Sequence, residues 1–205
     1  MTNTTKKILI TGFEPFGGET INPSLEAVMS LPSQIDNIII KKMSLPVVFG
    51  KSADVLYAAL DAEDFDAVIC VGQAGGKASI NIERVAINMD DTKSPDNEGN
   101  TPIDQSIFPN SPAAYFSTLP IKEIVANLIE AAIPAVVSNT AGTYVCNHVM
   151  YAALHYAAQK QPQMKAGFVH IPYLPVQVLD KNNAPSMTLE NVVAGLVVVV
   201  KAAVN

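Results

Sequence analysis

The chain has 205 residues, 49% of them hydrophobic and 16% charged, and its formal net charge at pH 7 is −6. This composition can build a sizeable core and excludes a disordered chain, and the acidic balance leaves no basic surface for nucleic acid. We therefore expect a soluble globular protein without a nucleic-acid partner, and the length indicates that residues 1–205 form one domain.

Cysteine content and the termini indicate the cellular setting. Two cysteines, Cys70 and Cys146, are too few for a disulfide framework, which favours the reduced cytoplasm. The N-terminal residues lack the apolar region and cleavage site of a secretory signal. The most apolar stretch, near the C-terminus, is too short to span a bilayer. The sequence therefore predicts a cytoplasmic protein that does not enter a membrane.

Apolar runs and helical patterns alternate along the first third of the chain. Residues 6–11 form an apolar run closed by Gly12, which predicts a buried strand. A glycine- and proline-rich loop follows, and then a helix over 23–31 with Asn22 as N-cap and Pro23 at its first position. The next predicted elements are a strand over 36–45, a helix over 47–60 and a strand over 64–72 of the continuous apolar type found in parallel sheets.

The alternation continues after an irregular segment. Residues 80–90 alternate imperfectly and predict a further strand. About thirty residues between 91 and 120 have little periodicity, which is long for a connection and indicates function or assembly. The last predicted elements are a helix over 121–132, strands over 134–140 and 166–172, a helix between them over 146–159, and a helix over 186–203 with Thr188 as N-cap and Glu190 in its first turn.

This order of elements predicts an α/β fold, a three-layer αβα sandwich with a mostly parallel, twisted central sheet. In such sheets the site lies at the carboxyl ends of the strands. Four segments meet this criterion: the loop after Thr11, the loop after Gly72, the turn before Cys146 and the end of the strand over 166–172.

Cys146 stands at the start of a predicted helix. A thiol there faces unpaired backbone N–H groups and the positive end of the helix dipole, and both favour the thiolate. The same N–H groups could hold a developing oxyanion. The alternative is a cysteine that packs as a small hydrophobe, which is what we expect for Cys70 inside its strand.

A nucleophilic cysteine needs a base, and the chain has three histidines. His148 lies two positions after Cys146 and His155 lies nine, so neither faces the thiol on one helix, and we expect both to be structural or surface residues. His170 ends a predicted strand at the carboxyl edge of the sheet, which makes it the best candidate on geometric grounds. A strand-end histidine that caps a carbonyl is the alternative.

A third group should orient the imidazole, and nineteen carboxylates compete for that role. Glu83 lies between Ile82 and Val85 in a mainly apolar segment, where a glutamate is either partnered or functional. A salt bridge with the neighbouring Arg84 is the alternative. The residues alone leave the choice open.

Six motifs identify a family resemblance. They are TGFEPFGGETINPS at 11–24, VGQAGG at 71–76, ERVAIN at 83–88, PDNEGN at 95–100, SNTAGTYVCNH at 138–148 and GFVHIPY at 167–173. With these motifs in order over most of its length, the chain resembles the pyroglutamyl peptidase I family, cysteine peptidases that remove N-terminal pyroglutamate from peptides. Several motifs are long and unusual, which makes the resemblance specific.

The resemblance implies a catalytic set of Cys146, His170 and Glu83, acting through a thioester on pyroglutamyl peptides. The first two residues agree with the choice made from the sequence pattern, and Glu83 resolves what that pattern left open. No metal or cofactor is expected, because the histidines and cysteines lack zinc-site spacing and nucleotide-binding motifs are absent.

The resemblance also implies a pocket for the lactam ring, formed by Phe13 and Phe16, by Asn22 and Gln73 at the polar edge of the ring, and by Tyr144 and Val145. A small neutral lactam suits aromatic faces and a few placed hydrogen bonds, without a charge to bind an ammonium group. Without the resemblance, the two phenylalanines would be interpreted as core aromatics that hold a Gly–Pro loop.

One position departs from the family pattern. An arginine and an aliphatic residue usually precede the PDNEGN motif, and the arginine is associated with the oxyanion region, whereas this chain has Lys93 and Ser94 there. Lysine keeps the charge but loses the planar fork of donors. Lys93 therefore stays a candidate for the oxyanion region, and backbone N–H groups near Cys146 are the alternative.

Assembly and rival functions complete the expectations. Family members from bacteria and archaea are commonly homotetramers, so the resemblance implies a homo-oligomer, a tetramer. Its contacts are expected in the segment 89–119, and the alternative is that this segment folds back on its own domain. The apolar and aromatic residues of the segment are Ile103, Ile107, Phe108, Tyr115 and Phe116.

Three rival functions stay open: another hydrolase or transferase on the same fold, a nucleoside phosphorylase, and an inactive binding protein.

Overall fold

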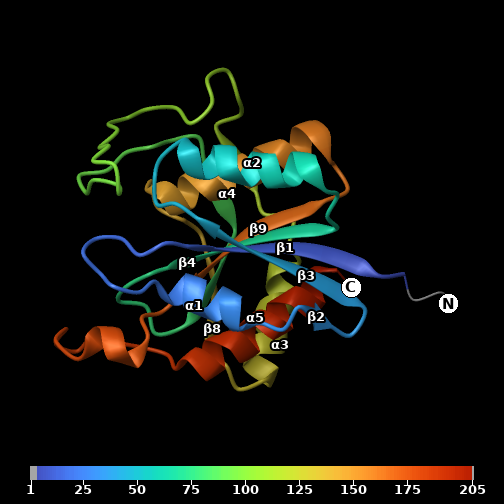
Figure 1. The fold of residues 1–205 in the computed structure, drawn as a ribbon, viewed down its shortest axis with the longest axis vertical. Coiled ribbons are helices and arrows are strands. Elements are labelled where there is room, and N and C mark those ends of the chain that lie inside the picture. The colour runs from blue at the N-terminus through green and yellow to red at the C-terminus, as the bar shows by residue number, and fades with distance from the viewer. Residues whose placement is uncertain (1–3, 205) are drawn as a thin grey trace.

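The computed structural model describes residues 4–204 as alternating strands and helices (Figure 1). The strands are β1 (Lys6–Phe13), β2 (Gln34–Ile35), β3 (Ile38–Leu45), β4 (Ala67–Gln73), β5 (Ile80–Glu83), β6 (Val85–Ile87), β7 (Ala114–Phe116), β8 (Ala135–Ser138) and β9 (Lys165–Ile171). The helices are α1 (Pro23–Ser30), α2 (Lys51–Ala62), α3 (Ile121–Glu130), α4 (Val145–Lys160), the 3₁₀ helix η1 (Pro175–Val178) and α5 (Leu189–Ala203). Among these described residues, no helix has both the length and the apolar character that crossing a membrane requires.

Within the described residues, a seven-stranded sheet in the order β2-β3-β1-β4-β9-β5-β8 forms the middle layer. Helices α2 and α4 cover one face, and α1, α3 and α5 cover the other (Figure 1). The predicted three-layer α/β fold with a mostly parallel sheet is therefore confirmed.

Side chains of the central strands alternate between two cores. In β1, Ile8 and Ile10 join the core under α1, α3 and α5, whereas Leu9 and Phe13 join the core under α2 and α4. Because a strand repeats every two residues, the same alternation in β9 places Phe168 in the α4 core and turns His170 toward α4.

Strand direction bears on one prediction about the site. Strands β1, β3, β4 and β9 are parallel, so the ends of β1, β4 and β9 meet at one edge as expected. Strands β5 and β8 are parallel to each other, but β5 is antiparallel to β9. The carboxyl end of β8 therefore lies at the opposite edge of the sheet, although Ala141 and Tyr144 of the turn before Cys146 still reach the predicted edge, where they line one cavity with His170. Residues 139–144 carry the chain from β8 to the start of α4.

The helix starts agree with two predicted caps. At α1, the Asn22 side chain accepts a hydrogen bond from the backbone N–H of Ser24, with Pro23 in the first turn. At α5, Thr188 accepts from the N–H of Asn191. The helix predicted over 47–60 begins later, at Lys51, because the residues before it form a buried connection that ends at a glycine with φ of 70°.

The irregular centre of the chain differs from prediction. The strand predicted over 80–90 is divided, because β5 joins the large sheet while β6 pairs with β7 in a separate two-stranded sheet. In the segment 89–119, Ile107, Phe108 and Tyr115 pack against the core under α2 and α4. Ile103 and Phe116 are 73% and 69% exposed. The segment therefore folds back on its own chain in part and still leaves two large apolar side chains at the surface.

Candidate active site

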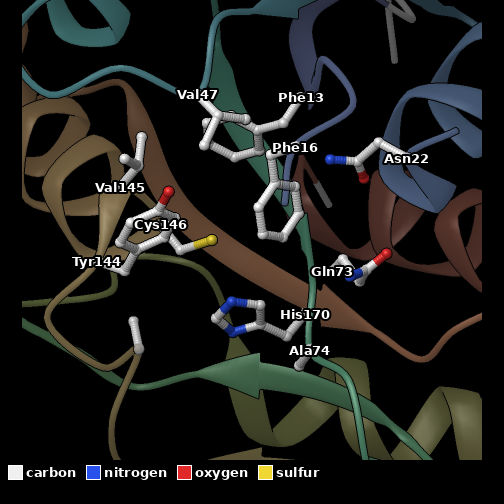
Figure 2. Close-up of a pocket in the computed structure, with 11 residues that line it drawn as sticks. Phe13, Phe16, Asn22, Val47, Gln73, Ala74, Tyr144, Val145, Cys146 and His170 are labelled. Atoms are coloured by element: carbon white, nitrogen blue, oxygen red, sulfur yellow. The ribbon is translucent and has the colours of Figure 1, made fainter. Parts of the chain in front are cut away.

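A cavity of about 250 Å³ lies where β1, β4 and β9 end (Figure 2). It contains every predicted pocket residue together with Cys146 and His170. Sequence analysis did not predict Val47 and Ala74, although the alanine beside Gln73 was a signal for space, and the small Ala141 lies in the cavity as its position before Cys146 suggests. The lining residues are Phe13, Phe16, Asn22, Val47, Gln73, Ala74, Ala141, Tyr144, Val145, Cys146 and His170.

Cys146 is the second residue of α4, and its side chain is half-buried. The N-cap residue Tyr144 makes no side-chain cap hydrogen bond, so the first-turn N–H groups of this helix receive no such acceptor. Figure 2 shows the sulfur directed into the space between Phe16 and His170. Cys70, by contrast, is fully buried, and burial raises the pKa of its thiol to about 12. Only Cys146 is therefore placed to react with a bound molecule.

Gly72 makes room for the thiol. It lies opposite His170 in the parallel register of β4 and β9. A Cβ atom at this position would come within 2.9 Å of Cys146 Sγ and 2.7 Å of a ring carbon of Phe168. Sequence analysis recognised Gly72 only as a strand end, because its neighbour across the cavity belongs to a distant helix.

Glu83 reaches His170 across two antiparallel strands. Asn81 is directly opposite His170, and Glu83 lies two residues further along β5 on the same face. Its Oε1 atom is 2.8 Å from His170 Nδ1, and both side chains are buried. The alternative partner Arg84 makes no ion pair with Glu83 among the described residues.

The imidazole of His170 lies between a thiol and a carboxylate. Its Nδ1 contacts Glu83, so Nε2 is the nitrogen left to face Cys146. Burial alone would lower the pKa of His170, but the charge and hydrogen bond of Cys146, with those of Glu83, outweigh burial and raise this pKa to about 9. The arrangement therefore favours the imidazolium form of His170 beside Cys146 at neutral pH.

Aromatic rings form the apolar wall. Phe13 is 2% exposed and lies 6.3 Å from Phe168, between ring centroids, so it belongs to the core and to the cavity at once. The Phe16 ring is 6.2 Å from that of Tyr144, whose hydroxyl donates to the carbonyl of Pro95 at 3.0 Å. Phe13 therefore fits both interpretations given by the sequence, a wall of the pocket and a core aromatic.

The polar edge consists of two amides whose oxygens are already bonded. Asn22 Oδ1 accepts from Ser24, and Asn22 Nδ2 donates to the carbonyl of Glu14 at 2.9 Å. Gln73 Oε1 accepts from Nε2 of Gln177, also at 2.9 Å. Gln177 was not predicted, because nothing in its local sequence links it to Gln73.

Lys93 is not brought to the site. Its side chain is exposed and does not line the cavity. A metal centre is also missing from the described residues, since none of their His, Cys, Asp and Glu side chains form a group of three or more that could hold an ion.

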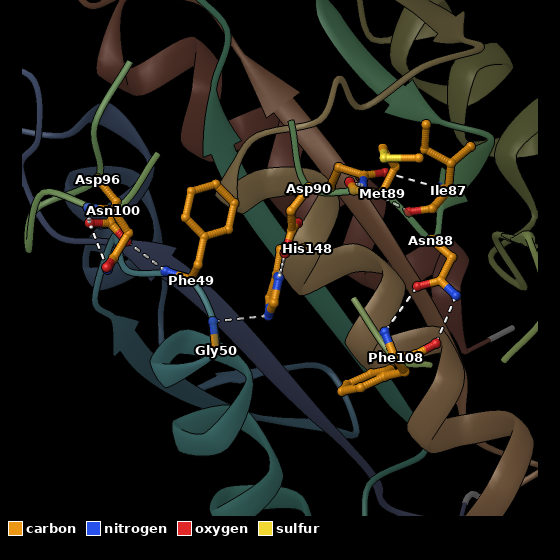
Figure 3. Close-up of polar contacts among 11 residues, drawn as sticks. Phe49, Gly50, Ile87, Asn88, Met89, Asp90, Asp96, Asn100, Phe108 and His148 are labelled. Carbon is orange, nitrogen blue, oxygen red and sulfur yellow. Dashed lines mark hydrogen bonds and ion pairs between the residues drawn. The ribbon is translucent and has the colours of Figure 1, made fainter. Parts of the chain in front are cut away.

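A second histidine–carboxylate pair includes His148, which lies on α4 two residues after Cys146 (Figure 3). His148 Nδ1 is 2.7 Å from Asp90 Oδ2, and both side chains are buried. His148 Nε2 accepts a hydrogen bond from the N–H of Gly50 at 3.1 Å. Beside it, the Asn147 amide bonds the backbone of Ile87 and Met89. These contacts fix α4, and with it Cys146, against the segment after β6.

Comparisons with known proteins identify the family of the chain. The family model for pyroglutamyl peptidase matches residues 6–205. Pyrrolidone-carboxylate peptidases from Alkaliphilus oremlandii and Thermosipho africanus are each 58% identical to the chain, covering 97% and 96% of it and 93% and 96% of their own lengths. Among solved structures, pyroglutamyl peptidase I from Bacillus amyloliquefaciens has a TM-score of 0.95 at 47% identity, covering 98% of this chain and 97% of that one. A mutant pyrrolidone carboxyl peptidase from Pyrococcus furiosus has a TM-score of 0.93 at 46% identity, covering 96% and 97%.

Proposed function

The chain belongs to the pyroglutamyl peptidase family, and from this premise we propose that Cys146, His170 and Glu83 hydrolyse the bond after an N-terminal pyroglutamyl residue. The family is one of cysteine peptidases, and the chain has one thiol that reaches a cavity. The observation that carries the assignment of roles is the contact chain from that thiol through His170 to Glu83.

The reaction divides into two steps. The Cys146 thiolate attacks the carbonyl carbon between pyroglutamate and the next residue, and a tetrahedral intermediate forms. His170 gives its proton to the leaving amine as the C–N bond breaks, which leaves a pyroglutamyl thioester. His170 then takes a proton from water, the water oxygen attacks the thioester, and the thiolate departs. Glu83 holds the ring and stabilises the imidazolium throughout.

Backbone N–H groups at the start of α4 stabilise the oxyanion in this proposal. The helix has no side-chain cap there, so its first donors stay available for a charge that develops beside Cys146. Lys93 has no role in this step, because its exposed side chain lies outside the cavity.

The cavity suits a neutral ring. Apart from the His170–Cys146 pair its lining has no charged side chain, and aromatic and aliphatic residues dominate it. A free α-ammonium group would lose its hydration there without gaining a counter-charge, which disfavours ordinary N-terminal residues. The ring of pyroglutamate carries no such charge.

Assembly and location follow as further parts of the proposal. We infer a homo-oligomer, a tetramer, whose contacts include the exposed Ile103 and Phe116. We also propose that residues 1–205 act as one domain in the cytoplasm, where the two free cysteines stay reduced.

Release of a fluorescent amine from a pyroglutamyl-amide, with a prolyl-amide as comparison substrate, tests the function. We expect release from the first substrate only. Iodoacetamide and Cys146→Ser should each abolish it, because both remove the thiolate. Cys70→Ser is the matched control and should keep the activity, since the Cys70 thiol is buried and outside the cavity. No release by freshly reduced, folded protein would contradict the proposal, and release that requires phosphate would favour a phosphorylase.

A further inference from the structure

The polar edge of the cavity depends on a buried glutamine that does not line it. Gln177, on η1, is 4% exposed. Its Nε2 donates to Gln73 Oε1 at 2.9 Å, and its Oε1 accepts from the backbone N–H of Leu174 at 3.0 Å. Gln177 therefore connects a fixed backbone donor to a side chain of the cavity.

The backbone N–H of Leu174 sets the orientation of the Gln177 and Gln73 side-chain amides. The N–H of Leu174 can only donate, so the Gln177 atom that it contacts must be the oxygen. The NH₂ group of Gln177 then faces Gln73 and must contact the Gln73 oxygen. The NH₂ group of Gln73 is left as a donor for the cavity, and Figure 2 shows the Gln73 oxygen on the side away from Cys146.

Gln177 is itself held at several points. Its backbone N–H donates to the carbonyl of Leu174 at 2.9 Å, and its own carbonyl accepts from Lys181 Nζ at 2.6 Å. Lys181 also forms an ion pair of 2.9 Å with Glu19, in the loop that carries Phe16. The Gln73 amide is therefore ordered before a ligand enters, which reduces the entropy that binding has to remove.

We propose that Gln177 is a positioning residue that selects for a ring carbonyl by holding Gln73 as a hydrogen-bond donor. The inference rests on the proposed peptidase function and concerns the substrate choice of that site. A pyroglutamyl ring has a carbonyl oxygen that can accept from Gln73. A prolyl ring has no ring carbonyl and a charged N-terminal NH₂⁺, so a donor would face a donor and both would stay unpaired.

Gln177→Glu tests the polarity of the contact. A carboxylate at 177 still accepts from Leu174 but cannot donate to Gln73, so the Gln73 amide should turn and present its oxygen to the cavity. We expect the KM for a pyroglutamyl-amide to rise about tenfold while kcat stays within about threefold. Gln177→Met removes both bonds without adding charge and should raise KM about threefold with the same unchanged kcat.

The matched control is Val176→Ala. Val176 is the neighbour of Gln177 on η1, but its side chain is 60% exposed and outside the cavity. Both kinetic constants should therefore stay at the wild-type values.

Binding can be measured without turnover, so that the peptidase proposal and the positioning role can fail separately. Cys146 is alkylated with iodoacetamide in the presence of either 2-pyrrolidinone or pyrrolidine. The concentration of each compound that halves the rate of alkylation is then compared. Wild type should prefer 2-pyrrolidinone, and Gln177→Glu should reduce that preference about tenfold. If wild type shows this preference and Gln177→Glu reduces it, but wild type hydrolyses no pyroglutamyl-amide, the peptidase proposal fails while the positioning role is supported.

Equal KM values and equal protection ratios in wild type and folded Gln177→Glu would overturn the positioning role. A fall of kcat and Tm together, with KM unchanged, would also overturn it, because a merely structural residue gives that pattern. If Gln177→Glu does not fold, the same criteria apply to Gln177→Met.

Discussion

The structure has two buried histidine–carboxylate pairs at α4, and they differ in the group that the second ring nitrogen of the histidine faces. His170 and His148 each place Nδ1 within 2.8 Å of a carboxylate oxygen, of Glu83 and Asp90 respectively. In each carboxylate the other oxygen is buried without a hydrogen-bond partner among the described residues. The difference is at Nε2, which faces a thiol in the cavity for His170 and a backbone N–H of Gly50 for His148.

This difference decides what each pair can do. A backbone N–H can only donate, so His148 Nε2 is the acceptor in this contact and its Nδ1 carries the proton that Asp90 accepts. The pair is therefore a fixed structural bond. His170 faces a group that can lose its proton, so its ring can change charge during a reaction. A buried histidine beside a carboxylate is therefore not a sufficient sign of catalysis, and the partner of the second nitrogen must be known.

Replacing each histidine by asparagine should give the largest contrast. Asparagine can still donate to the carboxylate through Nδ2, but it lacks the position of Nε2. We expect His170→Asn to lower kcat at least about a thousandfold while the protein stays folded. His148→Asn should keep kcat within about threefold and lower the free energy of unfolding by about 1–3 kcal/mol, since the Gly50 N–H is left unpaired. Steady-state kinetics and urea unfolding measure both, and a large loss of kcat in folded His148→Asn would contradict the comparison.

Replacing each carboxylate by the corresponding amide should give the same contrast between the two pairs, with a smaller difference in kcat. Glu83→Gln keeps the shape and removes the charge that stabilises the His170 imidazolium, so we expect kcat to fall about a hundredfold to a thousandfold. Asp90→Asn keeps an acceptor for His148 Nδ1 and should change kcat less than about threefold, with a loss of about 1 kcal/mol in stability. Equal kcat losses in the two variants would show that the pairs are not functionally distinct.

The pH dependence of stability should identify the His170 pair. The folded pKa of His170, about 9, lies above its ordinary value of 6.5. Its stabilisation is therefore complete below about pH 6.5 and is lost as pH rises through about 9. As pH rises between these limits, the free energy of unfolding of wild type, measured with urea, should fall by up to about 3 kcal/mol more than that of His170→Asn.

A titration of the His170 ring by NMR gives an independent measurement. Cys146 is the first of the groups that raise this pKa, so Cys146→Ser should shift it downward. An unchanged His170 pKa in Cys146→Ser would mean that the thiol and the ring do not interact.

The smallest effect is expected at Lys93. Because its side chain is exposed and outside the cavity, Lys93→Ala should change kcat/KM by less than about twofold. A tenfold loss of kcat without a change in Tm would instead restore this lysine to the oxyanion region.

Local patterns in the sequence predicted much of the fold. Apolar runs, the Asn22 and Thr188 caps and the start of a helix near Cys146 depend on neighbours within a few positions, so they could be identified without a structure. The same patterns selected Cys146 as a nucleophile and His170 as a strand-end base. Glu83 stayed open on the residues alone because its partner is 87 positions away.

What the sequence by itself determined is most of the strands and helices, a cysteine at a helix start and, through the family motifs, the candidate residues of the pocket. Only the tertiary structure decided the direction of β5 and β8, the space that Gly72 leaves for the thiol, and the link from Gln177 to Gln73. It also decided that His148 binds a backbone N–H while His170 faces Cys146. The physical reason is that propensities and caps act over one or two turns, whereas the partner of a buried side chain is set by strand order and helix packing.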